Sequence, residues 1–306
     1  MAGIINTGSF SKLLWPGLNS IFGETYTQYP REYDLIFDKS TSQKAYEEEL
    51  GVSMFGLAKV KPQGAPIEYD SAQQGFLYRY THIVYGLGFT ITREMREDNQ
   101  YMEIGLRNAK ALAWSMNETK EQVAAGIMNT AFNVGGNPTY GDGQTMISNS
   151  HPNVAGGTQS NQPLVNADLS EAALEQAVID ISLLTDDRGK LIALRPKKLI
   201  IPPQLQFEAK RVLGSDLRPG TPNNDLNALK TMGHFQDGVE LIHRLSSNSA
   251  WFIKTDAPDG LKYFERRAPE FEEDNEFDTE NARFKATERY SFGITDWRGV
   301  YASPGV

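Results

Sequence analysis

Two neighbouring segments of the chain repeat their apolar residues with different periods. Along residues 75–92, aromatic and β-branched residues alternate with polar ones, with one shift of phase between Tyr80 and Ile83. This period of two predicts a β-strand. Residues 48–61 predict a second extended arm, and the Pro- and Gly-containing stretch between the arms marks a tip, so residues 46–91 predict a two-armed ribbon. An isolated ribbon is marginally stable in water, so we expect it to lie on another surface, of which a neighbouring copy of the chain is the simplest.

Residues 93–132 have the period of an amphipathic helix instead. Apolar residues recur there at spacings of three, four or seven. The opposite face carries Glu97, Lys110, Asn117 and Glu121. At about 1.5 Å per residue, a helix of this length spans roughly 50–60 Å, which is long for a compact domain and indicates a structural spine. The alternative is two helices with an interruption near residues 98–100.

The flanking segments are more irregular. Residues 1–45 carry scattered apolar anchors, and the run Trp15, Pro16, Gly17 should interrupt a long helix because proline lacks the N–H donor. We therefore expect short helical pieces on an arm; the alternative is an ordinary first helix and strand of the core. Residues 133–168 are rich in Gly, Asn, Pro, Ser and Thr, which predicts a long surface loop with an exposed His151.

Residues 169–256 predict a compact α/β subdomain. A helix begins after Ser170, a favourable N-cap residue, and carries a buried stripe from Ala173 to Leu184. Short strands are predicted at 198–201, 239–242 and 251–254, and a further helix at 204–213.

The C-terminal part predicts two long antiparallel strands that pack against the long helix. Residues 261–271 are strand-like, and residues 284–294 alternate an apolar with a polar face. The stretch 270–280 between them holds seven acidic residues and no basic one, which predicts a solvated acidic turn. Divalent cations or a basic patch on a neighbouring copy are alternative partners for this turn.

Composition narrows the class of protein. The chain has 306 residues and the apolar and charged content of an ordinary globular protein. Its net charge of −9 disfavours a general nucleic-acid binder, because neutralising phosphates needs clustered Lys and Arg. The absence of cysteine excludes disulfides, thiolate catalysis and Cys-ligated zinc. No apolar run has the length of a membrane-spanning helix, and the start lacks signal-peptide features, so no membrane partner is expected.

Catalytic and cofactor motifs are missing from the sequence. There is no Walker-type phosphate loop, no H-E-x-x-H, no G-x-S-x-G and no complete dinucleotide-binding glycine motif. The histidines do not lie at metal-ligand spacing; they are His82, His151, His234 and His243. We therefore expect no catalytic residues, no cofactor and no metal, and we do not expect an enzyme.

The order of these parts resembles the major capsid proteins of tailed bacteriophages, and more specifically the Mu-like major head subunit family. Three stretches carry the resemblance: FTITREMREDNQYMEIGLRNAKALAWSMNETKE at 89–121, RGKLIALRPKKLIIPPQLQFEAKRVL at 188–213, and residues 251–305. The likeness covers most of residues 24–305. These motifs are architectural and become specific in this order.

The resemblance implies the α+β capsid fold of the Hong Kong phage type. Its parts map onto an N-terminal arm at 1–45, an E-loop ribbon at 46–92, a P-domain at 93–132 and 257–306 with the spine helix and long strands, and an A-domain at 133–256. The implied function is a major capsid protein whose hexamers and pentamers close an icosahedral head around double-stranded DNA.

The resemblance also implies partners and a location. The chain would contact itself, a portal, a decoration protein and, non-specifically, the packaged DNA, in a virion assembled in the host bacterial cytoplasm. Because the chain begins directly with the arm, we expect any scaffolding protein to be separate. Predicted intersubunit contacts are Lys59, Lys61, Tyr69, Glu272, Glu273 and Asp274.

Two other functions are weighed against the phage shell. One is a nanocompartment shell of the same fold that encloses cargo enzymes, which co-purified cargo would favour. The other is a soluble α/β enzyme, which would be a monomer or small oligomer with a deep pocket. Although some shells of this fold crosslink a ribbon lysine, no matching Glu or Asn partner is visible for Lys59 or Lys61, so we do not predict that activity.

Overall fold

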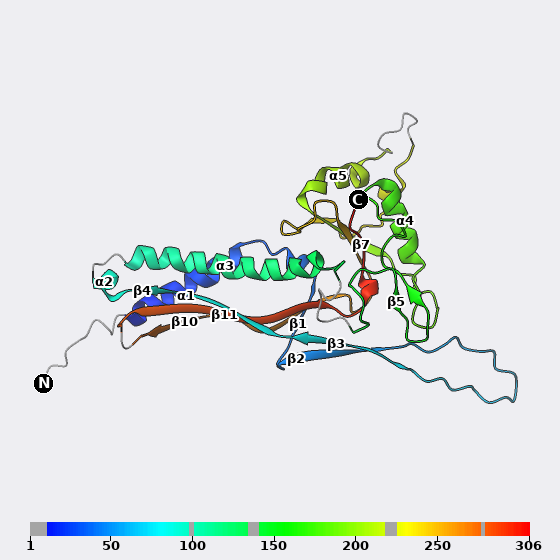
Figure 1. The fold of residues 1–306 in the computed structure, drawn as a ribbon, viewed down its shortest axis with the longest axis horizontal. Coiled ribbons are helices and arrows are strands. Elements are labelled where there is room, and N and C mark those ends of the chain that lie inside the picture. The colour runs from blue at the N-terminus through cyan, green and yellow to red at the C-terminus, as the bar shows by residue number, and fades with distance from the viewer. Residues whose placement is uncertain (1–10, 98–100, 134–140, 218–224, 277–278) are drawn as a thin grey trace.

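The computed structural model describes residues 11–97, 101–133, 141–217, 225–276 and 279–306. Figure 1 shows an elongated body of helices over long strands, an upright α/β unit at one end of it, and a ribbon that projects below that unit. Within these residues no helix is long and apolar enough to cross a membrane. The mixture of helices and strands confirms the predicted α+β class.

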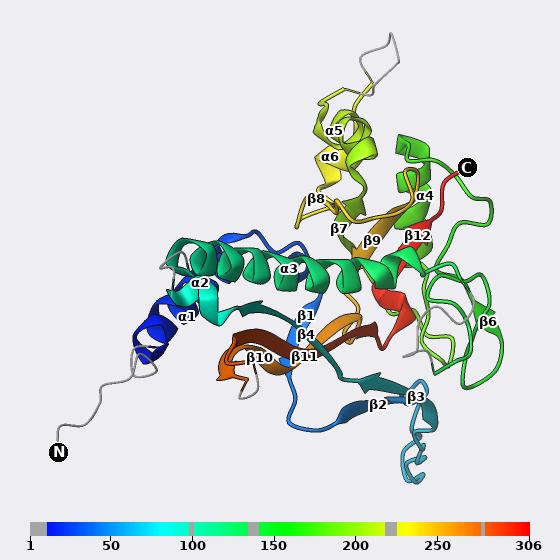
Figure 2. The same cartoon turned by 60° about the vertical axis from the view of Figure 1, so that its left-hand side comes forward.

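The elongated body is a four-stranded sheet with two helices on one face. In sheet order the strands are β1 (Asp38–Thr41), β10 (Leu261–Asn275), β11 (Ala282–Ile294) and β4 (Ile83–Ile91). β1 runs parallel to β10, and the other neighbours are antiparallel. Helices α1 (Ser11–Gln28) and α3 (Tyr101–Asn129) pack on each other and on this sheet, as the views in Figures 1 and 2 agree.

Helix α1 contradicts the expectation of short helical pieces in the N-terminal arm. It runs unbroken through Trp15 to Gly17, where the sequence predicts an interruption. Its residues Leu18, Phe22 and Tyr26 recur every four positions and are buried in one cluster with α3 and the sheet. Burial of this stripe outweighs the weak local preference, since most helix stability comes from tertiary packing.

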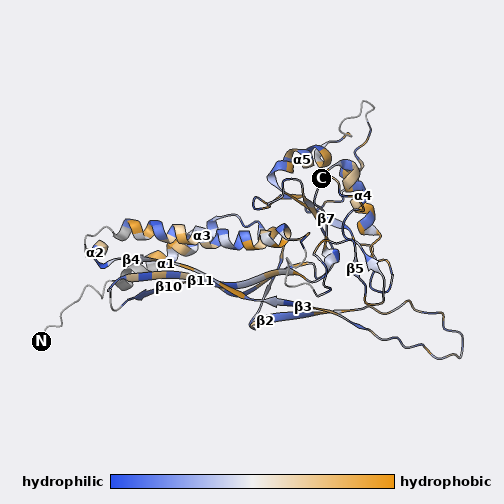
Figure 3. Ribbon diagram, in the orientation of Figure 1, coloured by the Kyte–Doolittle hydropathy of each residue, from blue (hydrophilic) through white to orange (hydrophobic). Residues whose placement is uncertain are grey.

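The predicted spine helix is described as two elements, α2 (Arg93–Glu97) and α3. Residues 98–100, where the alternative places an interruption, lie outside the described residues. α3 has 29 residues, about 44 Å at the usual rise, and Figure 3 shows hydrophobic and hydrophilic residues interleaved along it. Asn117 and Glu121 were predicted on its polar face, but both are buried, because the chain after α1 covers that face.

The ribbon is shorter than the sequence predicts. Its strands are β2 (Tyr46–Val52) and β3 (Gln74–Thr81), which pair antiparallel. The expected continuation at 83–91 leaves the ribbon and pairs with β11 as β4. The phase shift in the sequence marks this switch, because Tyr85 and Phe89 stack on aromatic rings of β11.

His82 lies at the switch between ribbon and sheet. Its side chain is buried. Its Nδ1 lies 2.9 Å from Ser291 Oγ and its Nε2 lies 3.0 Å from Ser42 Oγ. The ring therefore ties β4 to β11 and to the segment that follows β1.

The upright unit is the predicted α/β subdomain. A second four-stranded sheet has the order β12 (Val300–Ser303), β9 (Trp251–Thr255), β7 (Pro196–Ile201) and β8 (Val239–Leu241). The unit also contains α4 (Glu171–Ser182), α5 (Gln206–Gly214), α6 (Ala228–Met232), the short pair β5 (His151–Pro152) and β6 (Thr158–Gln159), and the 3-10 turns η3 (Pro203–Leu205) and η4 (Trp297–Gly299). A further 3-10 turn, η2 (Tyr33–Leu35), lies between α1 and β1. Ser170 caps α4 by accepting a hydrogen bond from the Ala173 N–H, as predicted.

The acidic stretch does not lie in a turn throughout. β10 continues to Asn275, so Glu270 to Asp274 belong to the strand. Cross-strand pairing explains the extension, because Glu272 faces Lys285 in register on β11 and their side chains form an ion pair of 2.7 Å.

A buried ion pair joins the two helices to the sheet. Glu288 lies on the apolar face of β11, and its Oε2 is 2.7 Å from Lys120 Nζ of α3 and accepts a hydrogen bond of 3.0 Å from the Tyr26 hydroxyl of α1. Glu288 is 0% exposed and Lys120 1%. Burial raises the pKa of the Glu288 carboxyl, whereas Lys120 favours its charged form. The ammonium group also lies within 5.7 Å of the ring centres of Tyr26, Tyr33, Tyr263 and Tyr290.

We expect Lys120→Met to lower the free energy of unfolding by about 3–5 kcal/mol, because it leaves an unpaired buried carboxylate. The double variant Lys120→Met/Glu288→Gln should lose less than the sum of the single variants. As a control, Lys285→Met removes an exposed ion pair and should leave the free energy of unfolding almost unchanged, because solvent screens such pairs. Urea unfolding monitored by circular dichroism measures wild type, both single variants, the double variant and the control. Equal losses of unfolding free energy at Lys120 and Lys285 would contradict the role given to the buried pair.

Candidate assembly surfaces

The loop between β2 and β3 is the most exposed part of the described chain. Residues 53–73 project from the body and carry apolar side chains with no core of their own (Figure 1). Val60 is 94% exposed and Tyr69 97%. Lys59, Lys61 and Tyr69, which the sequence predicts as contact residues, all lie on this loop, where Lys59 pairs with Glu68 at 2.6 Å. Exposed apolar groups on an extended segment are typical of a surface that a partner covers.

The base of this loop is held by the turn after α4. Arg188 donates hydrogen bonds to Asp70 Oδ2 at 2.6 Å and to the Ser71 carbonyl at 2.5 Å. Lys190 donates to the Phe55 carbonyl. The backbone N–H of Gly56 and the Arg188 guanidinium both hold the pKa of Asp70 below its ordinary value, the backbone bond being the larger cause. These contacts fix where the loop leaves the body and leave its tip unsupported.

The other predicted contact residues lie at the far end of the body. Glu272, Glu273 and Asp274 lie on β10, close to its end, and Figures 1 and 2 place that end away from the ribbon tip. Glu272 is paired with Lys285, and Glu276, just after the end of β10, pairs with Arg283 at 2.5 Å. The structure therefore does not bring the two sets together in one subunit. Their roles as intersubunit contacts stay predictions.

His151 contradicts the sequence-based expectation of an exposed histidine. It is 0% exposed, with Nδ1 at 2.7 Å from Asp142 Oδ2 and Nε2 at 3.1 Å from Asn161 Oδ1. Its ring stacks on Trp297 at 4.5 Å between centres. Asn161 is fixed in turn by donating to three backbone carbonyls. The loop that looked unstructured in sequence is thus packed around a polar core in its described part, 141–168.

A cluster of charges joins the arm, the spine and the α/β unit. Glu32 accepts hydrogen bonds from the N–H and Nδ1 of His243 and pairs with Arg244 at 2.8 Å. Arg244 also donates to Glu118 of α3 at 2.5 and 3.0 Å. One turn along α3, Glu121 accepts from the backbone N–H groups of Glu32 and Tyr33 at 2.8 and 3.3 Å. No motif in the sequence marks this cluster, because its members come from three distant segments.

The described residues offer no site with evident chemistry. No group of three or more His, Asp or Glu side chains among them is placed to hold a metal ion. A hollow of about 530 Å³ lies between the ribbon base and η4 and is lined by both polar and apolar groups. The predicted assembly surfaces are the projecting ribbon and the acidic end of β10, and both stay predictions.

Comparison with known proteins gives the class. A model of the phage capsid protein family matches residues 78–303, and no curated protein matches the chain. Three solved structures are similar. They are the capsid of a native GTA particle (13% identity, 90% of each chain covered, TM-score 0.53), the capsid of Ralstonia phage GP4 (9%, 88% of this chain and 87% of that chain, 0.53) and the virus-like particle from Pyrococcus furiosus (12%, 94% and 97%, 0.50).

The family match spans well over half of the chain, so this chain belongs to the phage capsid protein family. At these low identities the solved structures show the fold alone, and they confirm the predicted capsid fold of the Hong Kong phage type. The protein is therefore a structural subunit of a virion shell that associates with its own copies. The narrower Mu-like assignment stays a prediction.

Glu121 makes the stability of this subunit depend on pH. Burial, as the largest cause, raises the pKa of its carboxyl to about 7. In the unfolded chain the pKa of a glutamate carboxyl is about 4.3. Between these two pH values the carboxyl is protonated in the folded state but not in the unfolded state. The contribution of the protonated Glu121 to the unfolding free energy is therefore complete below about pH 4.3 and is lost as pH rises through about 7. We expect Glu121→Gln to flatten the fall in unfolding free energy between pH 5 and 8 by about 1–3 kcal/mol. Equal slopes for wild type and variant would refute this, and Glu103→Gln, at an exposed position of α3, is the matched control.

The contacts of Arg188 predict how firmly the ribbon base is held. Arg188→Ala should speed chymotrypsin cleavage within 53–73 by about two- to tenfold, because loss of a local anchor raises the population of open forms. The melting temperature should not change by more than about 1–2 °C, since surface ion pairs contribute little to global stability. Cleavage at the wild-type rate would show that the loop base is held by other contacts. Arg211→Ala, which removes an exposed pair on α5, is the control.

Proposed function

We propose that this chain is the major capsid protein of a tailed phage, and that its copies form hexamers and pentamers that close an icosahedral shell around double-stranded DNA. The observation that carries the proposal is the ribbon. Residues 53–73 extend away from the subunit with exposed apolar side chains, and among the described residues their contacts with the rest of the subunit lie at their base. A neighbouring subunit supplies that partner.

The charge of the chain supports DNA as cargo rather than as a tightly held ligand. A net charge of −9 repels phosphates, so a shell of such subunits lines a DNA-filled space without gripping the genome. The proposal extends to a portal, a scaffolding protein and a decoration protein as partners, and to assembly in the host bacterial cytoplasm. The E-loop, P-domain and A-domain assignments, with their sequence boundaries, belong to the same proposal.

A structural role is proposed in place of catalysis. Several acids and histidines of the described chain are engaged in pairs that hold segments together, as at His151 and Asp142 or Lys120 and Glu288. A nanocompartment shell that encloses protein cargo is the second candidate, but the match to the phage capsid protein family does not favour it.

Deleting residues 60–72 tests the ribbon directly. We expect closed shells to disappear from negative-stain micrographs, because the contact surface of the tip is gone, while the subunit keeps its circular dichroism spectrum and melting temperature. Replacing the same residues by a Gly/Ser linker of equal length should have the same effect, which separates loss of side chains from loss of length. Shells of normal size from either variant would show that the ribbon is not the lateral contact.

A further inference from the structure

Two arginines beside the switch from sheet to ribbon have no carboxylate partner. Arg266 lies on β10 and Arg289 on β11. Their basic neighbours Lys44, Arg79 and Arg267 each pair with a glutamate. In the part of the chain that the structure describes, no carboxylate lies within 4.0 Å of a nitrogen of either arginine side chain. Two positive charges are therefore left over at one place on an acidic protein.

Backbone carbonyls hold both guanidinium groups beside the same turn. Arg266 Nε donates to the Lys44 carbonyl at 3.0 Å. Arg289 donates from Nε to the His82 carbonyl at 3.1 Å and from Nη2 to the Ala45 carbonyl at 3.4 Å. Because Lys44 and Ala45 are adjacent, the two groups lie close together. Both terminal nitrogens of Arg266 and Nη1 of Arg289 remain available, and such planar N–H forks suit oxyanions.

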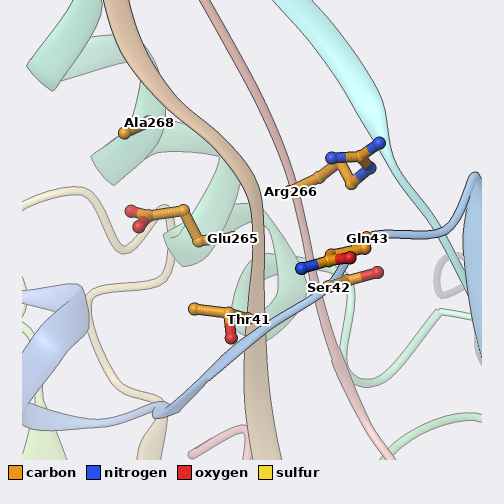
Figure 4. A pocket seen from close by; sticks show the side chains of 6 residues that line it. All are labelled: Thr41, Ser42, Gln43, Glu265, Arg266 and Ala268. Carbon is orange, nitrogen blue, oxygen red and sulfur yellow. The ribbon is translucent and has the colours of Figure 1, made fainter.

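A hollow of about 430 Å³ opens beside Arg266. Polar groups of Thr41, Ser42 and Gln43 line it together with Arg266, Glu265 and Ala268. Figure 4 shows Glu265 and Arg266 on opposite sides of β10. The Glu265 carboxylate forms an ion pair with Lys39 at 3.0 Å and accepts a hydrogen bond from the Tyr263 hydroxyl at 2.9 Å. The acid that lines the hollow therefore does not neutralise Arg266.

The positive charge acts on a neighbouring side chain. The pKa of His82 lies below its ordinary value; burial is the largest cause, and the charges of Arg289 and Arg266 lower it further. Glu47 acts in the opposite direction, but it already accepts from Lys44 and Ser42. The junction thus keeps a positive potential although the chain as a whole carries −9.

We propose that Arg266 and Arg289 form a carboxylate-binding site for a second copy of this chain, filled by the acidic end of the partner copy's β10 at residues 272–274. The proposal rests on the proposed shell function and adds the location of one intersubunit contact. Charge complementarity supports it. The strand end carries five described carboxylates, Glu272, Glu273, Asp274, Glu276 and Glu280, against three cations, Arg93, Arg283 and Lys285.

The contact has to form between copies rather than within one. Six to eight residues separate Arg266 from residues 272–274 along one strand, about 20–26 Å at the usual rise. No side chain spans that length. A site on one surface and its ligand on another make a head-to-tail contact, which repeats around a ring. Packaged DNA is a weaker fit, because a phosphate backbone needs an extended row of cations and here acidic residues follow along the same strand.

Charge reversal tests the pairing. Arg266→Glu/Arg289→Glu should lower the assembled fraction in sedimentation velocity by about tenfold or more, since like charges then face each other. Adding Glu272→Lys/Asp274→Lys to the same chain should restore assembly to within about threefold of wild type. Arg211→Glu, on α5, is the matched control and should assemble as wild type does. Thermal unfolding checks that each variant folds.

The absence of cysteine allows a second test that leaves every charge in place. Gln43→Cys lies in the hollow and Asn275→Cys beside the acidic strand end. Mild oxidation of assembled particles should give covalent ladders from the double variant and none from either single variant. A variant with Arg211→Cys in place of Gln43→Cys should give no ladder.

The outcomes separate this contact from the shell function. The contact would be overturned, and the shell function kept, if wild type forms shells but one of three results fails. These results are the loss of assembly on arginine reversal, its rescue by the acid reversals, and the covalent ladder. Arginine-reversed shells that assemble normally but enclose less DNA would also overturn it, in favour of phosphate binding. Failure of the wild-type chain to assemble would remove both.

Discussion

The structure depends on one buried ion pair in an otherwise apolar layer. Glu288 and Lys120 meet between β11 and α3, and the Tyr26 hydroxyl brings α1 to the same point. A charge in this layer is costly unless it is paired and hydrogen-bonded, so the pair permits one alignment of helix, sheet and arm and penalises others. This layer joins the two helices to the sheet, and the ribbon and the charged strand end extend from the body that it forms.

The two surfaces that we propose as intersubunit contacts lie at opposite ends of the subunit (Figure 1). The ribbon is anchored at its base by Arg188 and Lys190, and its tip projects away from the other described residues (Figure 1). The acidic end of β10 lies at the opposite end of the body (Figure 1). Contacts placed this far apart cannot satisfy each other inside one subunit. Surfaces at opposite ends of a subunit suit contacts between copies, as in a closed assembly of many subunits.

Sequence patterns predicted the elements whose residues interact locally. The alternation of β11, the cap at Ser170 and the strand at 198–201 all appear as expected, because local period and capping chemistry decide them. Patterns failed where distant segments decide the outcome. Pro16 lies within a helix because α3 and the sheet bury the following stripe, and His151 is buried because Asp142, Asn161 and Trp297 converge on it. From the sequence, contact residues could be chosen only by expected exposure and charge. Arg266 and Arg289 therefore looked like ordinary surface cations, because the pattern of one strand does not show that the fold brings the two side chains together.

An electron cryo-microscopy reconstruction of particles formed by the purified chain tests the central claim most directly. The account predicts a closed icosahedral shell in which residues 53–73 of each subunit lie against a neighbouring subunit while the Lys120–Glu288 layer stays intact. A particle in which these residues fold back onto their own subunit, or a chain that stays monomeric at high concentration even with its scaffolding protein, would contradict it.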